Sequence, residues 1–97
     1  MTLSLCVLLW ARPGLEDELS AYEDRVLALM RDHGGELLNR ARRDGSGDGP
    51  SEIQFLRFSS QEGVDSYLAD PRRTELAAER DRIVERTDTM PVTFLRQ

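Results

Sequence analysis

The strongest constraint in this sequence is an apolar segment near its start. Leu3 to Trp10 are apolar except for the hydroxyl of Ser4. The segment is much shorter than the ~20 residues that cross a bilayer, no basic residue precedes it, and the turn Arg12–Gly14 follows it where a secretion signal would have a cleavage site. We therefore expect a β-strand buried on both faces, with no membrane contact.

The next segment has the period of an amphipathic helix. From Leu15 onward, apolar residues recur on one face, and carboxylates gather in the first turns, where they favour the helix dipole. Gly34 and Gly35 are predicted to end this helix, because a left-handed C-cap favours a residue without Cβ.

The remaining segments predict two further strands, a helical region and a last strand. Ser59 and Glu62 match a capping box that opens a short helix, and Asp70-Pro71 fits the N-cap and first residue of another helix. A Gly-rich segment over 44–50 predicts a flexible hairpin connection. The inner stripe of the last helix is predicted to contain Leu76, Ala77, Arg80, Ile83 and Val84. The predicted strands are 36–43, 52–58 and Pro91 to Leu95.

The element order β-α-β-β-α-β predicts a ferredoxin-like α+β fold in a single domain over residues 1–97. Such a fold has a four-stranded antiparallel sheet with helices on one face, so the other face stays open. Leu5 and Val7 or their alternates, with Ile53 and Phe55, would form an apolar patch there. An exposed apolar face usually marks an interface, so we expect a homodimer in which two sheets form a dimeric α+β barrel.

The charge balance argues against a nucleic-acid partner. All 13 basic residues are arginine, and 18 acidic residues bring the net charge to -5. An acidic surface repels phosphate backbones. An RNA-recognition sheet would need exposed aromatic residues on its middle strands, whereas Phe55 and Phe58 fall on opposite faces. The anion-binding loop of an acylphosphatase is not recognisable at residues 11–14.

The numbers of cysteine and histidine residues argue against a disulfide and against a zinc site. Cys6 is the only cysteine and His33 the only histidine, so neither an intramolecular disulfide nor a zinc site is expected. A single cysteine fits a reducing cytoplasm. The glycines of the hairpin lead into another strand and not into a helix, which argues against a phosphate-binding loop. We expect no metal and no cofactor.

Three motifs resemble the domain of unknown function 1330 family. They are the segment Tyr22–Arg40 with Asp-His-Gly-Gly at 32–35, the junction Phe58–Glu62, and Tyr67–Arg73, and the resemblance spans about residues 5–95. It implies a dimeric α+β barrel without an established activity. The superfamily also includes cofactor-free quinone-forming monooxygenases, muconolactone-type isomerases and ligand-sensing domains. Arg57 departs from the family pattern, which has an acidic residue there.

Three polar residues are candidates for catalysis or ligand binding. His33 is either a general base or a cap of the last helical turn. Arg40 and Arg57 lie on adjacent predicted strands, where they form either a fork for a carboxylate or enolate, or salt bridges to acidic residues. Cys6 is expected to be a buried and inert thiol.

Three aromatic residues are candidate walls of a ligand pocket between sheet and helices: Trp10, Tyr22 and Tyr67. The alternative is that they are core residues, which we favour for Tyr22. Two classes of function remain open. One is a small-molecule binder or cofactor-independent isomerase or monooxygenase-like enzyme for aromatic or carboxylate or carbonyl compounds. The other is a non-catalytic structural or regulatory dimerisation module.

Overall fold

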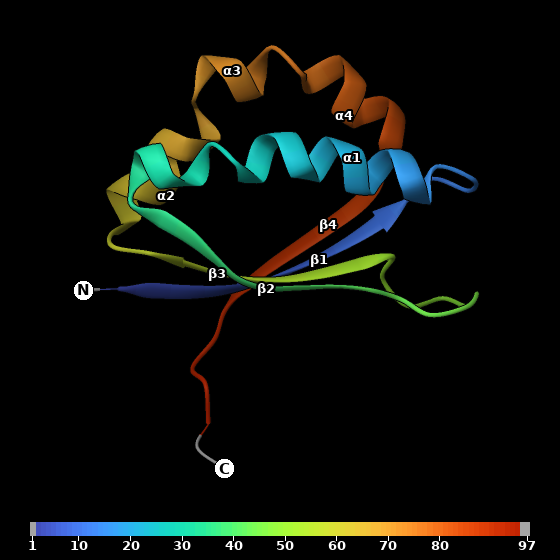
Figure 1. Cartoon of the computed structure of the whole chain (residues 1–97), viewed down its shortest axis with the longest axis horizontal. Coiled ribbons are helices and arrows are strands. Elements are labelled where there is room, and N and C mark those ends of the chain that lie inside the picture. The colour runs from blue at the N-terminus through green and yellow to red at the C-terminus, as the bar shows by residue number, and fades with distance from the viewer. Residues whose placement is uncertain (1, 96–97) are drawn as a thin grey trace.

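The computed structural model describes residues 2–95 and shows a sheet with helices on one face (Figure 1). The ends of the predicted domain, residues 1 and 97, lie outside the described residues. The helices are α1 (Glu16–Leu27), α2 (Gln61–Leu68), α3 (Pro71–Thr74), α4 (Ala77–Ile83) and the 3-10 helix η1 (Met30–His33). The strands are β1 (Leu3–Ala11), β2 (Gly35–Arg42), β3 (Glu52–Phe58) and β4 (Val84–Pro91).

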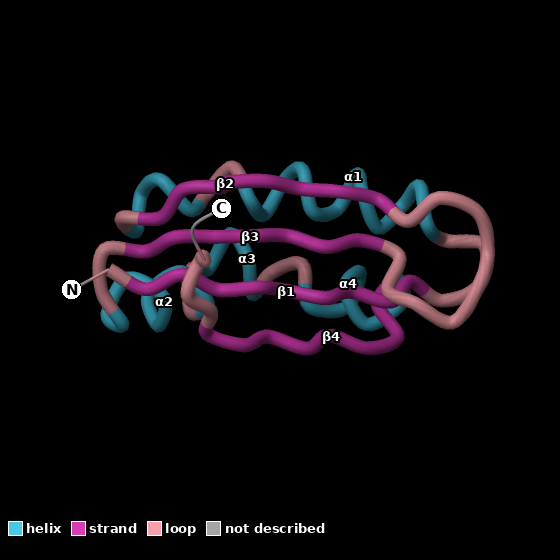
Figure 2. The backbone as a smooth tube through the Cα atoms, turned by 90° about the horizontal axis from the view of Figure 1, so that it is seen from below, coloured by secondary structure: helices cyan, strands magenta, loops and turns pink. Residues whose placement is uncertain are grey.

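The four strands form one antiparallel sheet in the order β2-β3-β1-β4 (Figure 2). The two central strands, β1 and β3, pair with Leu9 opposite Glu52 and Cys6 opposite Phe55. Figure 2 shows all helices on the far side of the sheet. This confirms the predicted ferredoxin-like α+β fold.

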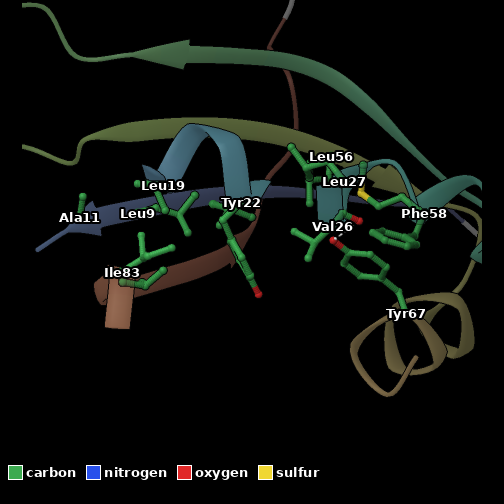
Figure 3. Close-up of a cluster of buried hydrophobic side chains, with 13 residues drawn as sticks. Leu9, Ala11, Leu19, Tyr22, Val26, Leu27, Leu56, Phe58, Tyr67 and Ile83 are labelled. Carbon is green, nitrogen blue, oxygen red and sulfur yellow. Dashed lines mark hydrogen bonds between the residues drawn. The ribbon is translucent and has the colours of Figure 1, made fainter. Parts of the chain in front are cut away.

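The helix-covered face carries the hydrophobic core. Alternate residues of β1 and β3 point toward the helices, so Leu9 lies beside Leu19 and Tyr22 of α1, and Phe58 packs against Tyr67 of α2 (Figure 3). Leu56 is buried in the same cluster. Further buried members are Val7, Ala11, Val26, Leu27, Met30, Tyr67, Ile83 and Val84. Burying this apolar surface on one face of the sheet is the main favourable contribution to folding.

The opposite face of the sheet carries no helix. On this face Cys6 pairs with Phe55, and Leu8 pairs with Ile53. The open apolar patch therefore contains Cys6 and Leu8 of β1, because Leu5 and Val7 point toward the helices. The chain after β4 returns over this face, where the ring of Phe94 lies 5.6 Å from that of Phe55. Phe94 is still half exposed, and Leu8, Ile53 and Phe55 are partly exposed on this face.

The last helix is shorter, and the last strand earlier, than predicted. The strand predicted over Pro91–Leu95 is wrong: β4 begins at Val84, and Pro91 is its last residue. Of the predicted inner stripe, Ile83 is buried at the end of α4 and Val84 belongs to β4, whereas Ala77 is exposed. The β-branched residues Thr87 and Thr89 alternate toward the helices and favour an extended backbone over another helical turn.

Two helix boundaries were predicted correctly and two were not. Gly34 has a φ of 73° and ends η1 as a left-handed cap, and Asp70 caps α3 with Pro71 as its first residue. However, α1 ends at Leu27, and the 3-10 turn completes the segment that was predicted as one helix. The N-cap of α2 is Ser60, whose hydroxyl accepts the N–H of Gly63 at 3.1 Å, so Ser59 was the wrong residue.

No helix in the described part of the chain has both the length and the apolar composition that spanning a bilayer requires.

Replacing Gly34 with alanine should destabilise the fold by about 1 kcal/mol or more, because its φ is positive and a Cβ would lie 2.5 Å from the Ser59 hydroxyl. Gly45 is a matched control, since its φ is 70° but its Cβ would meet no atom within 4 Å. Urea unfolding should show a larger loss for Gly34→Ala than for Gly45→Ala. Equal losses would contradict the role of this close contact.

Candidate functional site

A cavity of about 210 Å³ lies between the sheet and the helices. Its floor is apolar and comes from β1 and β3, and its walls include residues of all four α-helices. Figure 1 shows α3 and α4 arching over the layer that contains α1, and Arg73 and Arg80 reach the cavity from this arch. The polar groups of the lining are Glu23, Gln54, Tyr67, Arg73, Arg80, Thr87 and Thr89.

The only carboxylate in the cavity lining belongs to Glu23 of α1. Its side chain is buried, and its Oε1 accepts a hydrogen bond from Gln54 Nε2 at 2.7 Å. The same amide nitrogen donates to Oε2 of Glu52 at 2.8 Å. Burial raises the pKa of Glu23, and the nearby charge of Glu52 acts in the same direction, although the Gln54 hydrogen bond and the charges of Arg73 and Arg40 oppose them.

Arg40 neutralises the second buried carboxylate. Its Nε donates to Glu52 Oε2 at 2.6 Å, and one terminal nitrogen donates to the Ser20 carbonyl at 2.8 Å. A further ion pair joins Arg40 to Asp24. Arg40 therefore acts within the protein as a partner of acidic residues, which is one of the two alternatives that the sequence left open.

Arg73 and Arg80 are half-buried arginines at the cavity, and neither pairs with a carboxylate anywhere in residues 2–95. Arg80 donates to the Thr87 hydroxyl at 2.9 Å. The guanidinium of Arg73 lies 5.0 Å from the centre of the Tyr67 ring, and its Nε is buried without a hydrogen-bond partner among the described residues. These two groups can bind an anion that enters the cavity.

The two tyrosines occupy different positions. Tyr67 lines the cavity, and its hydroxyl donates to the Val26 carbonyl at 3.0 Å. Tyr22 belongs to the core and not to the lining, and its buried hydroxyl has no hydrogen-bond partner among the described residues. Figure 3 shows both rings in the layer below the sheet. Burial raises the pKa of both phenols.

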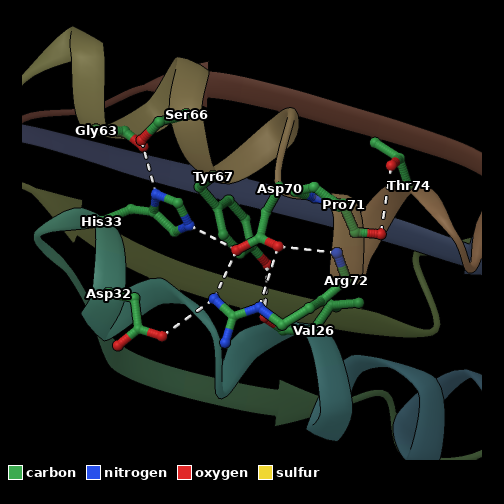
Figure 4. A network of polar contacts seen from close by, with 10 residues as sticks. All are labelled: Val26, Asp32, His33, Gly63, Ser66, Tyr67, Asp70, Pro71, Arg72 and Thr74. Atoms are coloured by element: carbon green, nitrogen blue, oxygen red, sulfur yellow. Dashed lines mark hydrogen bonds and ion pairs between the residues drawn. The ribbon is translucent and has the colours of Figure 1, made fainter.

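His33 lies outside the cavity lining, in a polar network that fastens η1 to the α2–α3 junction (Figure 4). Its Nδ1 is 2.7 Å from the Ser66 hydroxyl, and its Nε2 is 2.8 Å from Oδ2 of Asp70. Asp70 also accepts from the backbone and side chain of Arg72. With both ring nitrogens engaged, His33 has the geometry of a structural residue.

The predicted fork of Arg40 and Arg57 is wrong, because the two side chains lie on opposite faces of the sheet. A β-bulge between Leu37 and Asn39 inverts the faces of the following residues of β2. Arg40 therefore points toward the helices, whereas Arg57 lies on the open face and pairs with Glu36 at 3.3 Å.

Trp10 is also on the open face and cannot line the cavity, contrary to the prediction. Its indole N–H donates to the Asp48 carbonyl at 3.0 Å. The guanidinium of Arg86 lies 4.4 Å from the centre of its ring, at the distance of a cation–π contact. Trp10 thus packs against the hairpin and β4 and does not belong to the cavity lining.

Glu23, Gln54 and Arg73 line the cavity but were not predicted as site residues from the sequence. Gln54 could have been found, because it alternates with Leu56 and Phe58 on the inner face of β3. Glu23 follows Tyr22 on the helix, and its carboxylate was counted among the acidic residues that favour the helix dipole. Arg73 ends the motif Tyr67–Arg73, but nothing in that motif indicates that α3 holds this side chain at the cavity.

The residues 2–95 contain no cluster of three or more histidine, cysteine or acidic side chains that could hold a metal ion.

Comparisons with known proteins identify the fold but no family. No family model matches the chain, and no curated protein matches it in sequence. The resemblance to the domain of unknown function 1330 family is therefore confirmed only for the fold that it implied.

Solved structures of the same fold come from several bacteria. A dimeric protein of unknown function with a ferredoxin-like fold from Bacteroides fragilis has 13% identity and a TM-score of 0.72, covering 96% of both chains. A dabb family protein from Mesorhizobium loti has 15% identity and a TM-score of 0.70, covering 98% of both. A protein named as a candidate antibiotic biosynthesis monooxygenase from Bacteroides thetaiotaomicron has 15% identity and a TM-score of 0.78, covering 98% of this chain and 90% of that one. The chain has the fold of these ferredoxin-like and dimeric α+β barrel proteins.

The Asp70 network should make stability fall on acidification. Hydrogen bonds from Arg72 and His33 lower the pKa of Asp70 in the folded state. The ionised carboxylate therefore stabilises the fold at pH values above the ordinary aspartate pKa, and this stabilisation is lost as the pH falls below that pKa. Wild type should be more stable than Asp70→Asn in urea unfolding at pH 7, with a smaller difference at pH 3. Asn can still cap α3 through its amide oxygen, so the variant removes the charge and the hydrogen bonds that Oδ2 accepts from His33 and Arg72 but keeps the cap. Asp44→Asn in the exposed hairpin should show no such pH-dependent difference.

Proposed function

We propose that this protein is a cytoplasmic homodimer that binds a small, partly apolar carboxylate or carbonyl compound in the cavity between the sheet and the helices. The observation that carries this proposal is the pair Arg73 and Arg80, which face an apolar cavity without a carboxylate partner in the described chain. A half-buried guanidinium is costly to leave unpaired, because burial removes part of its hydration. An anionic ligand would supply the missing partner.

The rest of the lining supports the same class of ligand. Leu5, Leu56 and Val64 offer apolar contacts, and the Tyr67 ring offers a flat wall that suits an aromatic body. A volume of about 210 Å³ suits a compound with one ring and a short polar chain. The name of the Bacteroides thetaiotaomicron neighbour supports small-molecule chemistry for this fold.

The open sheet face supports the homodimer. Cys6, Leu8, Ile53 and Phe55 place apolar side chains on a face that no helix covers, and Met90 and Phe94 leave further apolar surface exposed. A second copy of the sheet would bury this face and close the barrel. This feature also favours the second candidate function, a dimerisation module that binds no ligand.

Ligand binding can be tested with benzoate and phenylpyruvate by titration calorimetry. Replacing Arg73 or Arg80 with glutamine should weaken binding at least about tenfold, because a hydrogen bond to a charged group contributes about 1.5–3 kcal/mol. The control is Arg82→Gln on the same helix, whose arginine pairs with Glu18 at 2.7 Å away from the cavity. Absence of binding to wild type would favour the dimerisation module.

The dimer can be tested by light scattering at micromolar concentration. We expect about twice the chain mass of 11.0 kDa for wild type. Phe55→Glu should give the monomer, because a carboxylate buried in an apolar interface costs several kcal/mol. Ala78→Glu places the same charge on the exposed side of α4 and should remain dimeric. A wild-type monomer would contradict the barrel.

A further inference from the structure

We propose that Glu23 is the catalytic base of the cavity and abstracts a proton from the carbon next to the carbonyl of a keto acid. This inference rests on the ligand site proposed above and adds a reaction to it. The cavity lining contains one carboxylate and two arginines that have no carboxylate partner among the described residues, so a single bound compound can contact both kinds of group.

The hydrogen bonds of Glu23 leave one of its oxygens available. Oε1 accepts from Gln54, whereas Oε2 makes no hydrogen bond to any residue of the described range 2–95, although the side chain lines the cavity. This oxygen is the atom that could receive a proton from a ligand.

Gln54 acts as a positioning residue for this carboxylate. Its amide nitrogen is shared between Glu23 and Glu52, and Glu52 is in turn held by two nitrogens of Arg40. Arg40 of β2 therefore fixes the position of the Gln54 amide through its contacts with Glu52. A fixed amide restricts the rotation of the Glu23 carboxylate and keeps Oε1 occupied, so that Oε2 remains directed to the ligand.

The surroundings make Glu23 a stronger base than an exposed glutamate. Burial raises its pKa, and no arginine forms an ion pair with it among the described residues. Arg40, which could neutralise it, is engaged by Glu52 and Asp24. The carboxylate of Glu23 is therefore a stronger base than an exposed one: the charges of Arg73 and Arg40 act against this, but neither arginine forms an ion pair with it among the described residues.

The proposed step is a proton transfer that needs no oxidant or reductant. Oε2 of Glu23 takes a proton from the carbon, the C–H electron pair forms the new C=C bond, and the carbonyl electron pair moves to its oxygen. Arg73, which lines the cavity, stabilises the enolate oxygen, and Arg80 binds the carboxylate of the keto acid. Return of the proton to the same carbon gives exchange, and its return to another atom gives an isomer.

The test is hydrogen–deuterium exchange of phenylpyruvate in D2O, followed by NMR as the loss of the C3 proton signal. Wild type should accelerate the exchange above buffer. Glu23→Gln keeps the shape of the side chain and should lower the accelerated rate at least about 100-fold, while the Kd of phenylpyruvate from calorimetry stays within about threefold. Glu62→Gln changes an exposed glutamate outside the cavity lining; this variant is the control and should exchange like wild type.

A conservative variant separates the base from a structural role. Glu23→Asp retains a carboxylate at a longer distance and should restore part of the exchange that Glu23→Gln loses. If Glu23→Gln does not fold, Glu23→Asp decides the question by a reduced rate with wild-type stability. Wild-type binding of phenylpyruvate without accelerated exchange, or undiminished exchange in both variants, would overturn this inference and leave the ligand site standing. Absence of binding would overturn the ligand site itself.

Discussion

The amide of Gln54 joins two carboxylates that this fold buries between its sheet and α1. Two acidic groups in one buried layer repel each other, so the arrangement needs compensation. Arg40 provides it for Glu52, and Gln54 provides a hydrogen bond to each. These residues belong to α1, β2 and β3, so the network holds α1 against the β2 and β3 side of the sheet. The other side is bridged by α3 and α4, and the cavity lies beneath them.

The fold could be predicted from local patterns, but the face of each strand residue could not. Strand β3 was predicted with correct bounds because alternation, a Gly-rich hairpin and a capping serine bracket it. The bulge in β2 has no equivalent signal: one extra residue near Leu38 turns Arg40 to the helix side and separates it from Arg57. A face assignment needs the register, and register depends on tertiary contacts.

The candidate site shows a different reason for failure. Trp10 was predicted as an aromatic wall of a pocket, and His33 as a base because it is the only histidine. Each is instead satisfied by structural contacts, Trp10 by the hairpin and Arg86 and His33 by Ser66 and Asp70. The groups at the cavity are common residue types, an acid, an amide and two arginines. Their chemistry arises from where the topology leaves them without partners, which no sequence motif encodes.

The composition of the chain makes it unexpected that Arg73 and Arg80 have no carboxylate partner among the described residues. The chain has 18 acidic residues for 13 arginines, so carboxylates are abundant. Of the half-buried arginines in residues 2–95, Arg40 and Arg57 find a carboxylate, and Arg43 donates to the carbonyls of Gly45 and Gly49. Arg73 lies over the Tyr67 ring and Arg80 donates to the Thr87 hydroxyl instead. The acid described in the same lining, Glu23, is bound to Gln54. In an acidic chain, two cations kept from carboxylates at one cavity are the observation on which the proposed anionic ligand rests.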